Sequence, residues 1–445
     1  MSPRSLYIAW LGPAPGEDAG VPGVAAELLH GLAARGHRID CFFPSSGQPI
    51  PPRLAESANI DFVWGTSAWK WDRWYSRTKI TAFASGMIAR GLSSLRLRRQ
   101  IEERHREQPY DLIYQFSGIE SPAVPGRLTR SVPLVIHPET HSAGELRSLI
   151  AERGLSARCE PRGRVVAVAA IMLARSLFQF IRIRRARLLV CISGVFRDEM
   201  VRDYRFPVGH TIVVPNPVRV ERFASEPKPI GDPPTVLVLG RIVVRKGVES
   251  VVAVAKLLRD RGVTVRIRVV GGPSLWSDYT KLLEELPPET AEYAGSLPGS
   301  EIPAELASAD LLLQASRYEP FALTVAEALA SGVPVVATRA VGAIERVDRS
   351  VVAEVPPGDA QAMATAIVEM LERVRADPLG MRSKASSEAE RLFASDIVCE
   401  QISSALERLV EETDDRSAAQ ASAASAAQPT PPAAGQPTPP ATAPR

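Results

Sequence analysis

The chain has 445 residues, 45% of them hydrophobic, with 53 Lys and Arg against 50 Asp and Glu and a net charge of +3. That length predicts two or three domains, and that apolar content is enough for ordinary globular cores. We expect no membrane-spanning helix, because Arg or Pro interrupts the longest apolar segments before the roughly 20 residues that a bilayer requires.

The four cysteines lack the spacing of a metal site, so we interpret them as reduced structural thiols. The first residues lack the organisation of a signal peptide, which predicts a cytoplasmic location.

Charge is distributed unevenly along the chain. Residues 1–216 hold 29 Lys and Arg against 19 Asp and Glu, and the remaining residues hold 24 against 31. A basic first half indicates an anionic partner, such as nucleic acid or an anionic membrane surface. The alternative is that these Arg side chains only cover solvated faces.

The first predicted element is a strand at Ser5–Gly12, followed by a loop rich in Gly and Pro and by a helix. Apolar residues recur at helical spacing in this helix, and Gly36 is placed to end it. The next strand is predicted at 38–44. A strand, a Gly-containing turn, a helix and a strand form the arrangement that brings the backbone close to a phosphate.

Residues 64–106 combine aromatic and basic side chains. The aromatic members are Trp64, Trp69, Trp71, Trp74 and Tyr75, and an Arg-rich run follows them. Such a mixture fits a surface that contacts a membrane interface or a glycan, and it also fits an amphipathic helix packed on the sheet. Two more strands are predicted at 110–118 and 132–140. His137 closes the second of them, and such a strand end faces a ligand.

The segment Arg162–Arg187 has an apolar body and basic ends. This pattern fits a helix that lies on an anionic membrane with its Arg groups in the headgroup layer. A helix buried on one side of the sheet explains the same pattern, and we favour it. The boundary between two domains is predicted near Asn216.

Residues 234–262 begin a second unit of strand, loop and helix that repeats the plan of the first. The run Asp310–Ser316 is short, apolar and bounded by polar residues, which predicts a buried strand of a parallel sheet. Glu319 follows at the carboxyl end of this strand. Pro320 suits the first position of a helix, and that helix stops at Gly332.

Ligands of open α/β sheets bind outside the carboxyl ends of the strands, and helix N-termini carry unpaired N–H groups with partial positive charge. We therefore expect Glu319 and the backbone of Phe321, Ala322 and Leu323 to face a ligand phosphate or sugar.

The string EPFALTVAEALASGVPVVAT at 319–338 resembles the E-x7-E hallmark of retaining GT-B glycosyltransferases of the glycosyltransferase family 4 type, also called glycosyl transferases group 1. The one clear departure is Ala322, because the family usually has Gly there. The resemblance implies that Glu319 binds sugar hydroxyls and that Glu327 binds the nucleotide ribose.

A second motif in this half carries the same resemblance. Gly240, Arg241, Lys246 and Gly247 match the family pattern G-R-x4-K-G. A planar guanidinium and an ammonium group together can neutralise a diphosphate leaving group.

The first half supplies two more candidates by resemblance. Gly20 matches the second of two glycines that approach the donor phosphate, and Ala19 replaces the first. The family often has a His at the strand end that His137 occupies, where it contacts the transferred sugar. We carry that role to His137, with His141 as the second choice.

The resemblance covers most of residues 5–412 and implies two Rossmann-like α/β domains that face each other across a cleft. We expect an acceptor-side domain at 1–215 and a nucleotide-sugar-binding domain at 216–386. A terminal helix at 387–412 is expected to return to the first domain. The Ala- and Pro-rich tail at 413–445 is expected to be disordered.

The implied reaction is transfer of a hexose from a nucleotide-diphosphate sugar with retention at the anomeric carbon. We expect no cofactor besides the donor, and no metal, because the globular part has no D-x-D motif. The expected acceptor is a glycan, a lipid or a small molecule, with a membrane-borne lipid or growing glycan preferred. We also expect peripheral contact with an anionic membrane and no nucleic acid partner.

Two other functions are compatible with the same residues. One is an isomerase of the nucleotide-sugar 2-epimerase kind on the same fold, which converts its donor without an acceptor. The other is a non-catalytic, nucleotide-binding scaffold of glycan assembly, because fold alone does not determine function.

Overall fold

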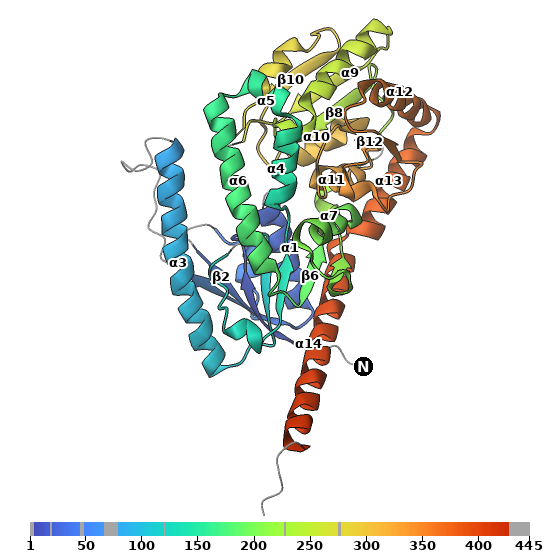
Figure 1. The fold of residues 1–445 in the computed structure, drawn as a ribbon. Helices are drawn as coiled ribbons and strands as arrows, with labels where there is room; N and C mark the ends of the chain where they lie inside the picture. The colour runs from blue at the N-terminus through green and yellow to red at the C-terminus, as the bar shows by residue number, and fades with distance from the viewer. Residues whose placement is uncertain are drawn as a thin grey trace, which may run out of the picture.

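The computed structural model of the chain contains two parallel β-sheets, each flanked by helices (Figure 1). It describes residues 4–17, 20–44, 49–65, 79–119, 121–226, 228–274 and 277–426, and it describes only the backbone at 79–90 and 421–426. Ala19, Trp69, Trp71, Trp74, Tyr75 and the tail from 427 onward therefore lie outside the described residues.

The first sheet has seven strands in the order β3-β2-β1-β4-β5-β6-β7. All its strand pairs are parallel, and most of its strands are buried along their whole length, as expected for apolar strands with helices on both faces. The strands are β1 (Tyr7–Leu11), β2 (Arg38–Phe43), β3 (Ile60–Trp64), β4 (Leu112–Phe116), β5 (Leu134–His137), β6 (Leu188–Cys191) and β7 (Thr211–Val213).

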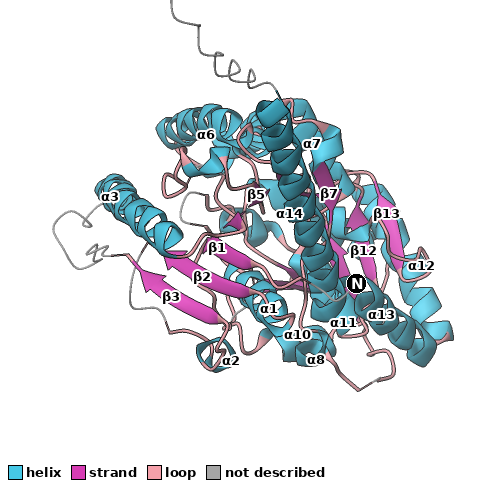
Figure 2. Ribbon diagram, turned by 90° about the horizontal axis from the view of Figure 1, so that it is seen from below, coloured by secondary structure: helices cyan, strands magenta, loops and turns pink. Residues whose placement is uncertain are grey.

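The helices associated with this sheet include two long ones, α3 and α6, which lie at the outside of the domain in Figures 1 and 2. Leu97 and Ile101 of α3 are buried in one cluster with side chains of the first sheet. They are α1 (Val21–Ala34), α2 (Pro52–Ala55), α3 (Lys79–Glu107), α4 (Ser142–Ala151), α5 (Arg153–Cys159), α6 (Arg162–Ile183) and α7 (Gly194–Tyr204).

The second sheet has six strands in the order β10-β9-β8-β11-β12-β13, again all parallel. The strands are β8 (Thr235–Leu239), β9 (Arg266–Val270), β10 (Ala291–Gly295), β11 (Leu311–Gln314), β12 (Val335–Thr338) and β13 (Val352–Val355). The helices that follow the first sheet are α8 (Val220–Phe223), α9 (Val248–Asp260), α10 (Ile302–Ser308), α11 (Leu323–Ala330), α12 (Ala360–Ala376), α13 (Pro378–Phe393) and α14 (Ser395–Ala426).

Both sheets reverse their strand order beside their first strand. The reversal lies between β1 and β4 in one sheet and between β8 and β11 in the other. Because ligands of such sheets bind at this switch point, outside the carboxyl ends of the strands, the loops after β8 and β11 are placed to form one site.

The last helix crosses back to the first domain, as predicted. Apolar side chains of α14 at Val398, Ile402 and Leu406 are buried in one cluster with Leu28 and Leu32 of α1. The two helices lie side by side, as Figure 2 shows.

The prediction of the C-terminal segment differs from the structure in two respects. The chain turns at Ala394, so the segment expected as one helix at 387–412 is divided between α13 and α14. In addition, α14 continues to Ala426, whereas the disordered tail is expected from residue 413. A run of Ala and Ser residues favours this extension because Ala has the highest helix propensity.

The position of α6 contradicts the preferred sequence-based interpretation. In the most apolar stretch of 18 residues in α6, only 11% of the residues are buried, so the helix is not covered by the sheet. By length and composition alone α6 is also long and apolar enough to cross a membrane, whereas we expected no such helix because Arg interrupts this segment.

Candidate active site

The loops after β8 and β11 meet because these two strands are paired. Leu311 lies opposite Val236 and Leu312 opposite Leu237, so both strands end at the same edge of the sheet. Gly247 ends the first loop in a left-handed conformation with φ 67°, and any side chain there would collide with the carbonyl oxygen of Ala315 after β11. This close approach brings Lys246 next to Glu319.

Glu319 is the centre of a buried charge cluster. Its Oε2 lies 2.6 Å from Lys246 Nζ and 2.7 Å from a guanidinium nitrogen of Arg245. Burial alone would raise the pKa of Glu319, but Arg245 and Lys246 hold it at about 2. Burial lowers the pKa of Lys246, and Glu319 opposes that effect. The carboxylate is therefore ionised at neutral pH, and two cations already neutralise it.

Arg245 is the residue that sequence reasoning missed. Its backbone oxygen accepts the N–H groups of Arg317 and Tyr318, and its side chain also contacts the Tyr318 carbonyl at 3.3 Å. The residue thus supports the turn that presents Glu319. The signal in the sequence was only a second basic residue directly before Lys246.

Arg241 lies at the mouth of the same site. It is exposed, and together with Lys246 and Gln314 it lines a cavity above the end of β8. Among the described residues, the Arg241 guanidinium is in no ion pair, unlike Arg245 and Lys246. The structure thus places the two predicted cations, Arg241 and Lys246, on one cavity.

The start of α11 has an unusual backbone conformation. Ala322 is the N-cap residue, with φ 81° and ψ 83°, in the left-handed region where a side chain is disfavoured. The buried ring of Phe321 packs edge-on against Phe393 at 5.6 Å, and Leu323 opens the helix. The family's usual Gly at position 322 is the residue that this backbone favours, so Ala322 holds the same turn at a cost in strain.

Glu327, Leu323 and Gly20 line a second, small cavity between the two domains. Gly20 is the N-cap of α1 with φ 91°, and Arg222 lines the cavity from the linker side. Burial raises the pKa of Glu327 to about 7. The structure therefore brings Gly20 of the first domain and Glu327 of the second together.

His137 occupies the predicted strand end, but its side chain is fully buried. Its Nδ1 lies 2.7 Å from the Tyr114 hydroxyl, and the ring of Phe116 packs edge-on at 5.2 Å. Burial lowers the pKa of His137 to about 3, so the ring is neutral. The nearest carboxylate is Glu139, at 4.0 Å from Nε2. The described contacts of His137 are all within the first domain, and the structure does not bring it to Glu319.

His141, the second choice, does reach the other domain. Its Nδ1 lies 2.9 Å from the hydroxyl of Tyr318, the residue before Glu319. The two domains each have an open parallel sheet, and their strand-end loops carry buried charge at a shared cleft. This arrangement is that of the GT-B class of glycosyltransferase folds.

Comparisons with known proteins identify the family. The model of Glycosyltransferase Family 4 matches residues 19–222, and the model of Glycosyl transferases group 1 matches residues 233–373. The chain belongs to the glycosyltransferase family 4 type, and that resemblance is confirmed.

Solved structures share the fold over nearly the whole chain. A sucrose-phosphate synthase from Thermosynechococcus elongatus has a TM-score of 0.66 at 20% identity and covers 92% of this chain and 100% of its own. The Anabaena protein HepE in complex with UDP and glucose has a TM-score of 0.61 at 19% identity, covering 91% of this chain and 100% of its own.

Curated relatives match over shorter regions. A GDP-mannose-dependent phosphatidylinositol monomannoside mannosyltransferase from Mycolicibacterium smegmatis is 31% identical over 201 residues, which are 41% of this chain and 51% of the relative. A glycogen synthase from Mycobacterium tuberculosis is 28% identical over 47% of this chain and 50% of the relative. The matched part of this chain therefore spans about half the length of these relatives.

Proposed function

We propose that the protein transfers a hexose from a nucleotide-diphosphate sugar to a membrane-borne acceptor, with retention at the anomeric carbon. The observation that carries this proposal is the contact of Glu319 with Lys246 and Arg245 at the paired ends of β8 and β11. The family models that match both halves of the chain support it.

The charges at the site suit cleavage of a bond to a diphosphate. When the sugar leaves, negative charge develops on the diphosphate, and groups fixed in advance near that charge stabilise the transition state. Lys246 and Arg241, which forms no ion pair with any residue that the structure describes, line the same cavity and supply two positive charges. The positive end of α11, whose N-cap Ala322 lies three residues after Glu319, adds to them. We propose that these groups neutralise the leaving group without a metal ion.

Glu319 and Glu327 suit two different parts of the donor. An ionised carboxylate accepts hydrogen bonds from sugar hydroxyls, which fits Glu319 because its pKa is low. Glu327 lies in the cavity between the domains with Gly20, and we assign it to the ribose of the nucleotide. The printed title of a structure with the same fold names UDP and glucose as its ligands, which supports a nucleotide-sugar donor.

The acceptor side of the proposal rests on α6. Its large exposed apolar residues recur on one face at a spacing that fits a helix lying in a bilayer interface. They are Val166 (67% exposed), Leu173 (53%), Leu177 (60%), Phe178 (63%) and Ile181 (60%). The helix contains no Asp or Glu.

Basic residues gather at the C-terminal end of α6, where Arg184 and Arg185 are exposed and Arg182 donates to the Ser121 carbonyl oxygen. Burial and the neighbouring guanidinium groups of Arg185 and Arg98 lower the pKa of Arg182 to about 10. Such a cluster complements anionic lipid headgroups. Both ends of α6 are attached to the folded protein, through α5, which packs against the second domain, and through β6 of the first sheet. A helix lying along the surface therefore fits the topology better than one that crosses the membrane.

Incubation with a panel of nucleotide sugars and a lipid extract tests the function. We expect one donor to be consumed only when acceptor is present, with an anomeric configuration in the product equal to that of the donor by NMR, and with full turnover in EDTA. Donor conversion without acceptor would instead indicate the isomerase, and donor binding without any turnover would indicate the scaffold. An inverted product would contradict retention, and loss of turnover in EDTA would contradict the metal-free mechanism.

Flotation with vesicles tests the membrane contact separately. We expect the protein to bind vesicles that contain phosphatidylglycerol, and Leu177→Asp to reduce that binding at least tenfold, because a charged side chain at the interface opposes insertion. Leu379→Asp is a matched control, since Leu379 is 57% exposed on α13 of the second domain. Equal loss in both variants, or binding to neutral vesicles alone, would contradict the assignment to α6.

A further inference from the structure

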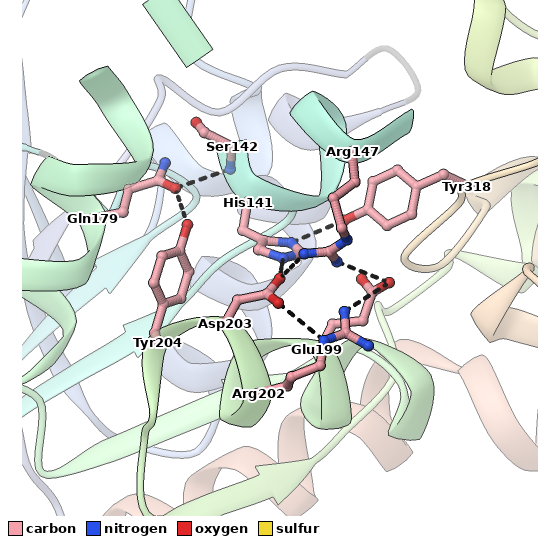
Figure 3. A network of polar contacts seen from close by, with 9 residues as sticks. All are labelled: His141, Ser142, Arg147, Gln179, Glu199, Arg202, Asp203, Tyr204 and Tyr318. Atoms are coloured by element: carbon pink, nitrogen blue, oxygen red, sulfur yellow. Dashed lines mark hydrogen bonds and ion pairs between the residues drawn. The ribbon is translucent and has the colours of Figure 1, made fainter. Parts of the chain in front are cut away.

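The turn that carries Glu319 is bonded to the first domain on both sides of that residue. On one side the Tyr318 hydroxyl lies 2.9 Å from Nδ1 of His141, the N-cap residue of α4 (Figure 3). On the other side the Ser193 hydroxyl donates to the Pro320 carbonyl oxygen at 2.7 Å. Glu319 therefore lies between two contacts to the first domain, although it belongs to the second.

Asp203 of α7 holds the His141 ring in one orientation. Its Oδ2 lies 2.6 Å from His141 Nε2, and Arg147 and Arg202 also bond to this carboxylate. Burial would raise the pKa of Asp203, but hydrogen bonds from His141, Arg147 and Arg202 hold it well below its usual range. Because an ionised carboxylate only accepts, Nε2 carries the proton and Nδ1 is left to accept from Tyr318.

The fit of Tyr318 against α4 is close. A side chain at Gly144 would collide with both the Tyr318 hydroxyl and the His141 ring, so this helix position has room only for Gly. Phe196 and Tyr204 pack edge-on against the same ring at 5.5 and 5.7 Å. Burial raises the pKa of Tyr318, which keeps its hydroxyl a donor.

We propose that Tyr318 is a positioning residue and that its hydrogen bond to His141 is a latch between the domains, which sets the place of Glu319 relative to the first domain during donor binding. This inference rests on the proposed function for its effect on the donor. The latch itself rests only on the contacts between the two domains.

Two substitutions of His141 separate its two hydrogen bonds. The side-chain oxygen of Asn falls close to the position of Nδ1, so His141→Asn retains an acceptor for Tyr318. The side-chain amide of Gln reaches the position of Nε2, so His141→Gln retains a donor to Asp203 and loses the latch. Tyr318→Phe removes the latch from the other domain.

For Tyr318→Phe and His141→Gln we expect the donor KM and the Kd of the nucleoside diphosphate to rise about tenfold, with kcat changed less than threefold. His141→Asn is expected to stay within threefold of the wild type in both. The double variant Tyr318→Phe, His141→Gln is expected to cost no more than either single one, because both remove the same bond.

Tyr110→Phe controls for the loss of a buried phenol. Its hydroxyl donates to Asp40 at 2.7 Å. Tyr110 comes just before β4, at the amino-terminal ends of the strands and therefore on the side opposite the cleft. This variant should leave donor KM unchanged. Donor constants that are unchanged in Tyr318→Phe, or that rise equally in His141→Asn, would overturn the positioning role.

A distance measurement tests the latch without any donor. Spin labels on the exposed residues Glu56 after α2 and Glu372 of α12, in a Cys159→Ser background, report the separation of the domains. We expect Tyr318→Phe and His141→Gln to add a population with a longer distance, and His141→Asn to match the parent. One distance common to all variants would overturn the latch. If the wild type binds no nucleoside diphosphate, the proposed function fails, and this distance still decides the latch.

Discussion

Replacing Lys246 by Met removes one of the two cations from Glu319 and keeps the apolar stem of the side chain. Arg245 and Lys246 hold the pKa of Glu319 at about 2, against an ordinary value of 4.5. At roughly 1.4 kcal/mol for each factor of ten, this preference for the ionised carboxylate is about 3 kcal/mol. The two cations lie at nearly equal distances, and burial of the carboxylate opposes both, so Lys246→Met should lose at least half of it.

The effect on turnover should exceed the effect on stability. A positive group fixed at the site of developing charge is typically worth about 3–4 kcal/mol, so kcat/KM for the nucleotide sugar should fall about 10²- to 10³-fold. The thermal midpoint should fall by only about 2–6 °C, because Arg245 remains. Lys256→Met is the control, since Lys256 forms an exposed pair with Glu285 at 2.9 Å and should change neither quantity appreciably. Turnover of Lys246→Met within threefold of the wild type would refute the proposed role of this cation.

Three further substitutions test particular features. Ala322→Gly should raise the thermal midpoint by about 2 °C, because relief of left-handed strain of about 1–2 kcal/mol exceeds the entropy cost of Gly, and a lower midpoint would contradict the strain. Burial raises the pKa of Glu327 to about 7, so between pH 4.5 and 7 the folded protein keeps a proton that the unfolded chain has lost, and stability falls as pH rises. In Glu327→Gln the free energy of unfolding should fall by about 2–3 kcal/mol less between pH 4.5 and 8 than in the wild type, measured by denaturant titration. An unchanged pH profile would contradict this assignment. Gly31→Ala should destabilise the protein by about 1–3 kcal/mol, because the new methyl group collides with Cys399 of α14. Gly163→Ala is the control, because the added methyl group meets open space there. Equal thermal midpoints for the two variants would contradict the docking of α14.

The sequence predicted that Glu319 and Lys246 both face the donor, and the structure brings them to one edge of the second sheet because of its topology. Each residue comes after an apolar strand, and parallel strands that pair place their following loops at one edge. The sequence did not show that Arg245 also reaches Glu319. A 3-10 turn at Val244–Lys246 decides which basic side chains point inward, and its geometry is not visible in the residue pattern.

His137 shows a second limit. Its place at the end of β5 was predicted, but the direction of its side chain depends on the register of the sheet. His137 lies opposite Phe116, and Tyr114 and Phe116 belong to the buried cluster that α1 and α14 cover. Whether a strand-end side chain points into that cluster or out to the cleft follows from pairing that the sequence does not display.

The interpretation of α6 failed for a different reason. A helix with an apolar body and basic ends has the same periodicity whether a sheet or a membrane covers its apolar face. The structure shows that α4 and α7 contact α6 and that most of its apolar side chains remain exposed. The choice between the two interpretations therefore required the position of the neighbouring helices.

A crystal structure with a bound nucleoside diphosphate, UDP or GDP, tests the central claim most directly. The account predicts a diphosphate within about 3 Å of both Lys246 Nζ and the Arg241 guanidinium, with the ribose against Glu327. A nucleotide bound away from the ends of β8 and β11, with Lys246 still paired only to Glu319, would contradict it.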